Sequence, residues 1–169
     1  MTIGRAEQIS LPELGVSKVY AKTDTGADLS TIWATRIREE EGVLKFRLFS
    51  KKSPHYTGIT IKVQSPDYLL TRVASSFGHK ELRYVIKIKI KVKGKTVRAT
   101  FSLSDRRKKN YPILIGRKLL NGKFIVDVSK GTPLRSLEYD KKKRMRKELE
   151  VFNRWERAHE DSHTFKRRI

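Results

Sequence analysis

Hydrophobic and polar residues alternate most regularly in the middle of this 169-residue chain, between residues 86 and 103. Isoleucine or valine stands at positions 86, 88, 90 and 92, and lysine stands at 87, 89, 91 and 93. A Gly94-Lys95 turn follows, and apolar residues then recur at 97, 99, 101 and 103. A two-residue period places successive side chains on opposite faces of a strand. The pattern predicts a β-hairpin with one buried face and one strongly basic face.

Short apolar runs separated by turn signals predict further strands on both sides of this hairpin. The runs lie between residues 3 and 23 with a break at Leu11–Gly15, and then at Ser30–Ile37, Val43–Phe49, Ile59–Val63, Ile113–Ile115 and Phe124–Val128. A helical turn is expected at Lys118–Leu120. The fold class predicted from these runs is all-β, with many short strands.

The end of the chain changes character after Gly131 and Pro133. From Glu138 to about Ala158 the pattern predicts a helix, with Met145, Leu149, Phe152 and Trp155 on one stripe among charged residues. We therefore expect a β domain over residues 1–136 and a basic helical extension over residues 137–169.

Charge is the strongest compositional signal. Thirty-nine Lys and Arg against eighteen Asp and Glu leave a net charge of +21. Eleven basic and seven acidic residues lie from Leu137 onward, so the helical extension carries +4 and the β domain +17. The basic hairpin face (Lys87, Lys89, Lys91, Lys93, Arg98) and the run Lys141–Arg144 predict a polyanionic partner, either RNA of the ribosome or an acidic protein substrate.

The location expected from composition is the cytoplasm, without membrane contact. No apolar stretch is long enough to span a bilayer, and the amino terminus lacks the apolar segment of a secretory signal. The chain has no cysteine, which excludes disulfides and thiolate zinc sites.

The candidate chemistry begins where a predicted strand ends, at Asp24-Thr25-Gly26-Ala27. Alone, these residues are typical of a plain turn. Together with the downstream segment Ile113–Leu120 they resemble the active-site loop and the second signature of the retropepsins. More broadly, Ile3 to Val128 resembles the bacterial and archaeal retropepsin-like group called "ATP-dependent zinc proteases", which is associated with an ATP-grasp ligase that adds glutamates to a ribosomal protein. The matching pieces are Ile3–Arg5, Leu11–Gly15, Asp24–Ala27, Ser75–Gly78, Glu81–Arg83 and Leu114–Arg117.

The resemblance implies a retropepsin-like closed β-barrel with a short helix, and a catalytic role for Asp24. Aspartic peptidases hold a water between two carboxylates that share one proton, because like charges about 3 Å apart cannot both ionise. A chain with one such loop needs a second copy, so a homodimer with the site on its two-fold axis is expected. Thr25 would bond across that axis, Gly26 would allow close approach of the backbone, and Ala27 completes the loop. No cofactor is expected.

The residues expected to contact substrate are less specific. They are Arg72, His79, Glu81, Arg83 and Arg117, and each arginine is equally suited to a structural ion pair. Residues 51–83 occupy the place of the retropepsin flap but contain only Gly58 and Gly78, so we expect a cover that differs from the Gly-rich flap or is absent.

Two alternatives to an aspartic peptidase remain open. One is a catalytically silent basic β-domain that binds RNA or the ribosome. The other is a zinc metallopeptidase built on His159-Glu160-x-x-His163, which matches the zincin pattern. It lies near the end of the chain among charged neighbours and outside the part that resembles the family, so no metal is expected. No Walker-type phosphate loop supports ATP binding.

Overall fold

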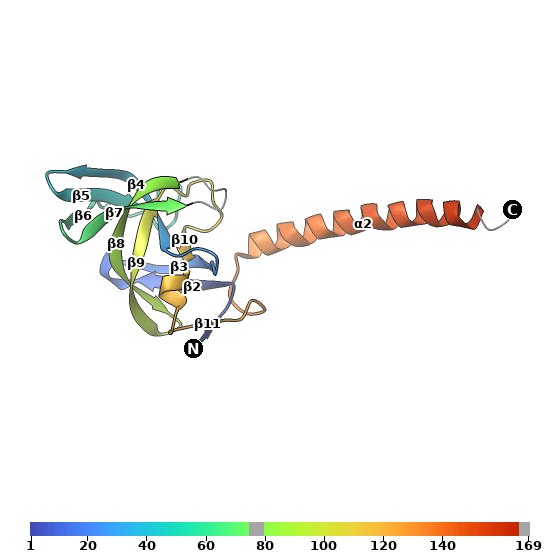
Figure 1. Cartoon of the computed structure of the whole chain (residues 1–169), viewed down its shortest axis with the longest axis horizontal. Helices are drawn as coiled ribbons and strands as arrows, with labels where there is room; N and C mark the ends of the chain where they lie inside the picture. Colours follow the sequence, from blue (N-terminus) through green and yellow to red (C-terminus); the bar gives the residue numbers. More distant parts are fainter. Residues whose placement is uncertain (75–79, 166–169) are drawn as a thin grey trace. The chain divides into compact units, whose positions relative to one another are not determined.

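The computed structural model describes residues 1–74 and 80–165, without the side chains of Ala158 and residues 160–165. It divides into two compact units, Met1–Thr132 and Pro133–Ile169. The first unit is built almost entirely of strands, and the second contains one helix (Figure 1). A mostly-β body followed by a C-terminal helix is the class that the hydrophobic pattern predicts.

The elements of the first unit follow one another through short turns. They are β1 (Thr2–Ile3), β2 (Ala6–Leu11), the 3-10 turn η1 (Pro12–Leu14), β3 (Val16–Thr23), β4 (Ser30–Glu40), β5 (Val43–Leu48), β6 (Ile61–Gln64), β7 (Tyr68–Ala74), β8 (Lys80–Val92), β9 (Lys95–Ser104), β10 (Ile113–Ile115), α1 (Arg117–Leu120) and β11 (Ile125–Val126).

The main sheet joins strands that are far apart in the sequence. Its order is β10-β3-β2-β8-β9-β4-β5-β6, with β7 on β8, and β10 also pairs with β4. The pairings from β10 through β3, β2, β8, β9 and β4 therefore return to β10 as a ring. The central β10 binds β3 in parallel and β4 antiparallel, which fixes both strands that flank Asp24.

The predicted hairpin is β8 and β9, paired from Val85–Ser102 to Val92–Lys95. Its alternation is confirmed, because the even positions from Ile86 to Val92 are buried and the lysines between them are exposed. The buried face joins the core, whose largest fully buried side chains include Phe46, Phe49, Phe101, Ile9, Ile32, Ile90, Leu103, Ile113 and Ile115.

The ends of the first unit are tied to each other. β1 pairs in parallel with β11, the Arg5 N–H donates to the Lys130 carbonyl at 3.0 Å, and the Thr132 N–H donates to the Ala6 carbonyl at 2.7 Å. A Cβ on Gly4 would lie 2.1 Å from the Lys130 carbonyl carbon, so the two segments require a glycine there.

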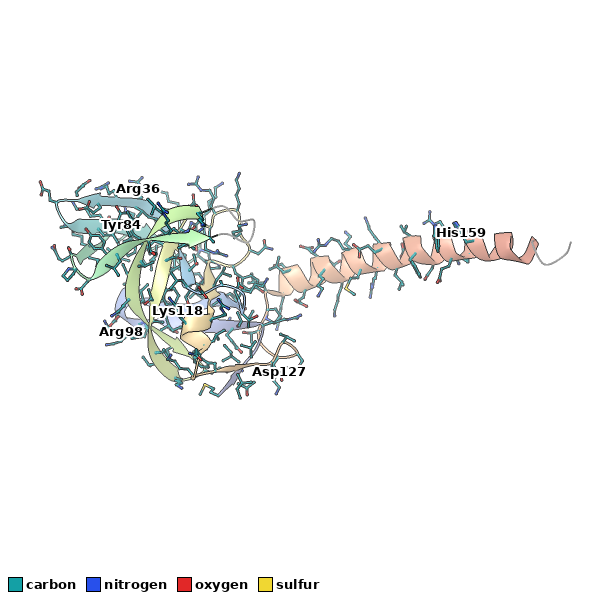
Figure 2. All side chains as sticks on the ribbon, viewed as in Figure 1. Arg36, Tyr84, Arg98, Lys118, Asp127 and His159 are labelled. Carbon is teal, nitrogen blue, oxygen red and sulfur yellow. The ribbon has the colours of Figure 1, made fainter. Side chains whose placement is uncertain are left out.

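The second unit is α2 (Arg135–Phe165), longer at both ends than the predicted helix. Figure 2 shows its side chains projecting on all sides. No helix within the described residues is long and apolar enough to cross a membrane.

Candidate active site

The Asp24 loop, residues 24–29, begins where β3 ends against β10. The Thr23 hydroxyl donates to the Gly4 carbonyl at 2.7 Å, which anchors the last strand residue. The Asp24 N–H then donates to the Ile115 carbonyl at 2.9 Å. This bond extends the parallel β3–β10 pairing by one residue, so Asp24 is held at the first position of the loop.

The carboxylate of Asp24 organises its own loop. Its Oδ1 accepts the N–H groups of Gly26 and Ala27, each at 3.1 Å. Asp favours such turns because its short side chain reaches backbone N–H groups two and three residues ahead. The result is a fixed carboxylate orientation, with Asp24 half-buried and Thr25 and Gly26 exposed.

The segment Gly116–Lys118 supports the loop from behind. The Gly116 N–H donates to Ser30 Oγ at 3.1 Å, and the N–H groups of Arg117 and Lys118 donate to the Ala27 and Asp28 carbonyls at 2.8 and 3.0 Å. A Cβ on Gly116 would lie 2.5 Å from the carbonyl carbon of Leu29. The glycine of the second motif is therefore required by direct contact with the first.

Arg117 makes a local ion pair. Its guanidinium contacts the Asp28 carboxylate, and both side chains are more than half exposed. Of the two roles expected for Arg117, substrate contact or a structural ion pair, this contact is the structural one. Asp28 is the acidic residue nearest to Asp24 in sequence. Its carboxylate is engaged by Arg117 and is therefore a poor candidate for the second catalytic carboxylate.

Buried hydroxyl groups lie beneath the loop. Thr31 Oγ1 and Ser102 Oγ are 2.9 Å apart, and Ser102 Oγ donates to the Ser30 carbonyl at 3.3 Å. All three residues are buried. They join the start of β4 to β9, so the far side of the loop rests on a satisfied polar network in the core.

Arg106 lies in the electrostatic environment of Asp24. The pKa of Arg106 is lowered to about 10, mainly by burial and in smaller part by the positive charge of Arg83, while the Asp24 carboxylate acts in the opposite direction. Arg106 is anchored by its Nε, which donates to the Tyr111 carbonyl at 3.0 Å. Arg106 therefore interacts electrostatically with both the Asp24 carboxylate and the Arg83 guanidinium.

Arg83 reaches this region from the β7–β8 hairpin, in the segment where the resemblance places the flap. The described strands pair from Tyr68–Ile86 to Ala74–Lys80, and the residues 75–79 between them lie outside the described part of the chain. Arg83 is 18% exposed and forms an ion pair with Glu81. The segment that the resemblance assigns to the flap thus contains a paired hairpin, without glycine in its described strands.

The other residues predicted to contact substrate do not all lie on the same face of the β7–β8 hairpin as Arg83. Arg72 pairs with Leu82 while Arg83 pairs with Thr71, so alternation puts Arg72 on the opposite face of the hairpin from Arg83. Glu81 shares the face of Arg83. His79, also predicted as a contact, lies outside the described residues.

Sequence reasoning missed Arg106. It stands in the basic loop between β9 and β10, and 82 residues separate it from Asp24 in the chain. The available signal was its position just before Ile113–Gly116, the segment that binds the Asp24 loop.

The predicted basic face of the hairpin is partly neutralised, since two carboxylates contact three of its five cations. Lys89 and Arg98 both contact the Glu13 carboxylate, at 3.0 and 3.1 Å, and Lys93 Nζ lies 3.1 Å from Glu7 Oε1. Glu7 is only 3% exposed and also accepts the Gly4 N–H at 2.6 Å. Part of the hairpin charge therefore stabilises β2 and η1 rather than facing a polyanion.

A hollow of about 360 Å³ lies beside these ion pairs. Its lining includes Glu13, Tyr68, Lys87, Arg98 and Thr100, and no residue of the Asp24 loop contributes to it. It is separate from the candidate active site.

The residues described in this structure contain no group of three or more His, Asp or Glu side chains close enough to hold a metal ion. His159 Nδ1 lies 2.8 Å from the Trp155 carbonyl, and its ring stacks on Trp155 at 4.1 Å between centroids. The side chain of His163, its proposed partner, lies outside the described part.

Residues 2–132 match the family described as RimB-like, "Retropepsin-like aspartic endopeptidase RimB". Two curated relatives, each named "Probable alpha-L-glutamate ligase", come from Shewanella pealeana (32% identity, 75% of this chain, 28% of the relative) and Desulfotalea psychrophila (30% identity, 74% of this chain, 27% of the relative). The chain thus matches less than a third of their length.

A solved structure shares the fold. The crystal structure of a Legionella pneumophila protein of unknown function superposes with a TM-score of 0.59 at 24% identity, over 77% of this chain and 95% of that one.

Proposed function

Because the chain belongs to the RimB-like family of retropepsin-like aspartic endopeptidases, we propose that it hydrolyses amide bonds in acidic, glutamate-modified proteins. The observation that carries the proposal is the Asp24 carboxylate, which the N–H groups of Gly26 and Ala27 hold in place and which interacts with the positive charge of Arg106. A carboxylate alone suits many substrates. The guanidinium of Arg106, which interacts with Asp24 and with Arg83, favours a substrate that brings its own negative charge.

The names of the relatives agree with this substrate class. They are described as probable α-L-glutamate ligases, and a matching segment covers 28% of one of them. A ligase that adds glutamates creates acidic chains whose amide bonds a peptidase of this kind would cut. We propose such chains as the substrate.

The proposed mechanism needs two copies of the chain. The motif Asp24-Thr25-Gly26 occurs once in the sequence, so the second carboxylate comes from a second copy, and the ring of paired strands serves as the retropepsin barrel that holds each loop. One carboxylate takes a proton from water, whose oxygen attacks the carbonyl carbon, while the protonated carboxyl donates its proton to the carbonyl oxygen. The tetrahedral diol then collapses. The C–N bond breaks as the amine nitrogen receives the proton that the first carboxylate took from water, and the other carboxylate takes a proton from a diol hydroxyl.

The test uses Asp24→Asn, which keeps the size of the side chain and the carbonyl-type oxygen at Oδ1. Hydrolysis of a peptide ending in several α-linked glutamates is followed by mass spectrometry, with a glutamine-for-glutamate peptide as control. We expect cleavage of the acidic peptide alone, and loss of at least about a thousandfold in rate in the variant. Its thermal unfolding and oligomeric state should match those of the parent protein.

Retained cleavage in Asp24→Asn would remove Asp24 from the chemistry. An inert parent protein that instead binds RNA with steep salt dependence would favour the silent RNA-binding β-domain. The ion pairs of Lys89, Lys93 and Arg98 with Glu13 and Glu7 remove two of the five positive charges on which that alternative depends.

A further inference from the structure

The helix α2 presents an uncovered apolar stripe. Met145, Leu149, Phe152 and Trp155 are each between 52% and 59% exposed. At 100° per residue, Met145, Leu149 and Phe152 fall within an arc of about 60°. Phe152 and Trp155 stack with their ring centroids 6.4 Å apart, which makes the stripe continuous over three turns. A long helix in water gains most of its stability by packing such a stripe against a partner.

Charged residues end the stripe on both sides, and their signs are opposite. Lys142 lies seven residues before Leu149, and Glu156 lies seven residues after it. Both are exposed and lie within about 80° of Met145, Leu149 and Phe152 around the helix. Each is therefore about 10 Å along the axis from Leu149.

The charges of two such helices are complementary only when the second α2 runs in the opposite direction. Antiparallel pairing about Leu149 places Lys142 of each helix beside Glu156 of the other, and Met145 beside Phe152. Parallel pairing would instead set lysine against lysine and glutamate against glutamate, which is repulsive. The polar face opposite the stripe, which carries Lys143, Arg144, Lys147 and Arg154, stays in water in either case.

The same charges disfavour a lipid surface. An amphipathic helix in a bilayer interface buries its apolar face, and here that face would carry the Glu156 carboxylate with it. We propose that α2 binds α2 of a second copy of this chain, antiparallel, along Met145, Leu149 and Phe152.

The pairing has a consequence that rests on the proposed function. A stripe of four side chains is small for a stable interface, so the helix pair alone should be weak. Linked to the body, it would raise the effective concentration of the second copy and favour assembly of two Asp24 loops.

The absence of native cysteine allows a direct test in the full-length chain. Single variants Met145→Cys and Phe152→Cys are oxidised separately and as an equimolar mixture. Antiparallel pairing predicts strong disulfide-linked dimers in the mixture and at least about fivefold less in either variant alone. Val151→Cys, on the other side of the helix, is the control and should not cross-link.

A charge reversal gives a second measurement that does not depend on oxidation. Lys142→Glu and Glu156→Lys should each raise the dimer dissociation constant at least about tenfold in sedimentation equilibrium, since two attractive contacts become repulsive. The double variant, and the mixture of the two single variants, should restore it. Residues 142 and 156 are about 21 Å apart in one helix, so the rescue requires a partner helix.

Efficient cross-linking of Met145→Cys alone would overturn the antiparallel arrangement. Absence of cross-links in every mixture would overturn pairing of α2, and RNA binding lost on neutralising Lys143 and Lys147 would then assign the helix to nucleic acid. Because cross-linking is independent of catalysis, its outcome is separate from that of Asp24→Asn.

Discussion

At the scale of single residues, the conformation of the Asp24 loop depends more on Gly116 than on Gly26. A Cβ at Gly116 would lie 2.5 Å from the Leu29 carbonyl carbon and 2.9 Å from the Ala27 carbonyl oxygen, both of them backbone atoms that cannot move alone. A Cβ at Gly26 would meet only Asp24 Oδ1, at an ordinary 3.4 Å. The loop and its support are therefore in tightest contact behind the carboxylate.

Gly116→Ala should destabilise the protein by about 1–3 kcal/mol, as overpacking of a close contact does. Gly26→Ala is the matched control for stability and should change the free energy of unfolding by less than about 1 kcal/mol. Urea unfolding followed by tryptophan fluorescence measures both. Equal effects of the two substitutions would show that the contact behind the loop is not tight in solution.

Arg83 should contribute to recognition of an acidic substrate. A hydrogen bond to a charged group contributes about 1.5–3 kcal/mol, so Arg83→Gln should lower kcat/KM on the glutamate peptide roughly tenfold to a hundredfold. Cleavage of any neutral peptide that the enzyme accepts should change much less. Lys87→Gln removes a charge from the same strand outside the site and serves as control. An identical loss in both variants would assign the effect to net charge alone.

At the scale of elements, charged side chains hold strands and turns together. Lys93 at the end of β8 reaches the buried Glu7 of β2, and Asp127 organises the turn after β11 (Figure 2). Asp127 accepts the Ser129 N–H and hydroxyl at 3.0 and 2.5 Å and contacts Lys130 Nζ at 3.0 Å. That turn also carries the Lys130 carbonyl that binds Arg5.

Replacing Lys93 by methionine should leave the Glu7 carboxylate buried with only the Gly4 N–H as a partner. We expect a loss of about 1–3 kcal/mol in the free energy of unfolding, as for a buried charge that loses one partner. Lys91→Met, at an exposed position of β8, should change the free energy of unfolding by less than about 0.5 kcal/mol. A stable Lys93→Met variant would mean that water replaces the ammonium group.

The Asp127 turn predicts a pH dependence. The Ser129 hydroxyl, followed by Lys130 and the Ser129 N–H, lowers the pKa of Asp127 to about 2 from an ordinary 3.8. Because the folded-state pKa is the lower one, the carboxylate stabilises the fold above about pH 4, and this contribution is lost as the pH falls toward 2. Asp127→Asn should therefore unfold more easily than the parent protein at pH 6, and the difference should disappear near pH 2. A difference that persists unchanged at low pH would contradict this origin.

At the scale of the whole molecule, a net charge of +21 acts on every encounter with an acidic partner. Charged surfaces accelerate association with opposite charges, and salt screens the effect beyond about 10 Å at 0.1 M. We expect kcat/KM for the glutamate peptide to fall several-fold between 20 and 300 mM salt, while the thermal midpoint changes little. A salt-independent rate would indicate that recognition is confined to the neighbours of Asp24.

Local pattern was sufficient for most elements of this chain, although it did not predict β7. The two-residue alternation from Ile86 to Leu103 marks the β8–β9 hairpin, because alternation follows directly from strand geometry. The turn-forming residues Asp24 and Gly26 mark a loop at the end of a strand, and the stripe from Met145 to Trp155 marks the helix. Each of these signals involves residues close together in sequence. The sequence also carries the resemblance that identifies the family.

Only the tertiary structure decided which charged residues and which motifs contact one another. The ring of strands brings Gly116 against Leu29 and Arg106 into the field of Asp24, and it pairs Lys89, Lys93 and Arg98 with Glu13 and Glu7. It also turns Arg72 to the other face of the hairpin from Arg83. Such contacts depend on strand order and register, which non-local pairing fixes and local pattern does not encode.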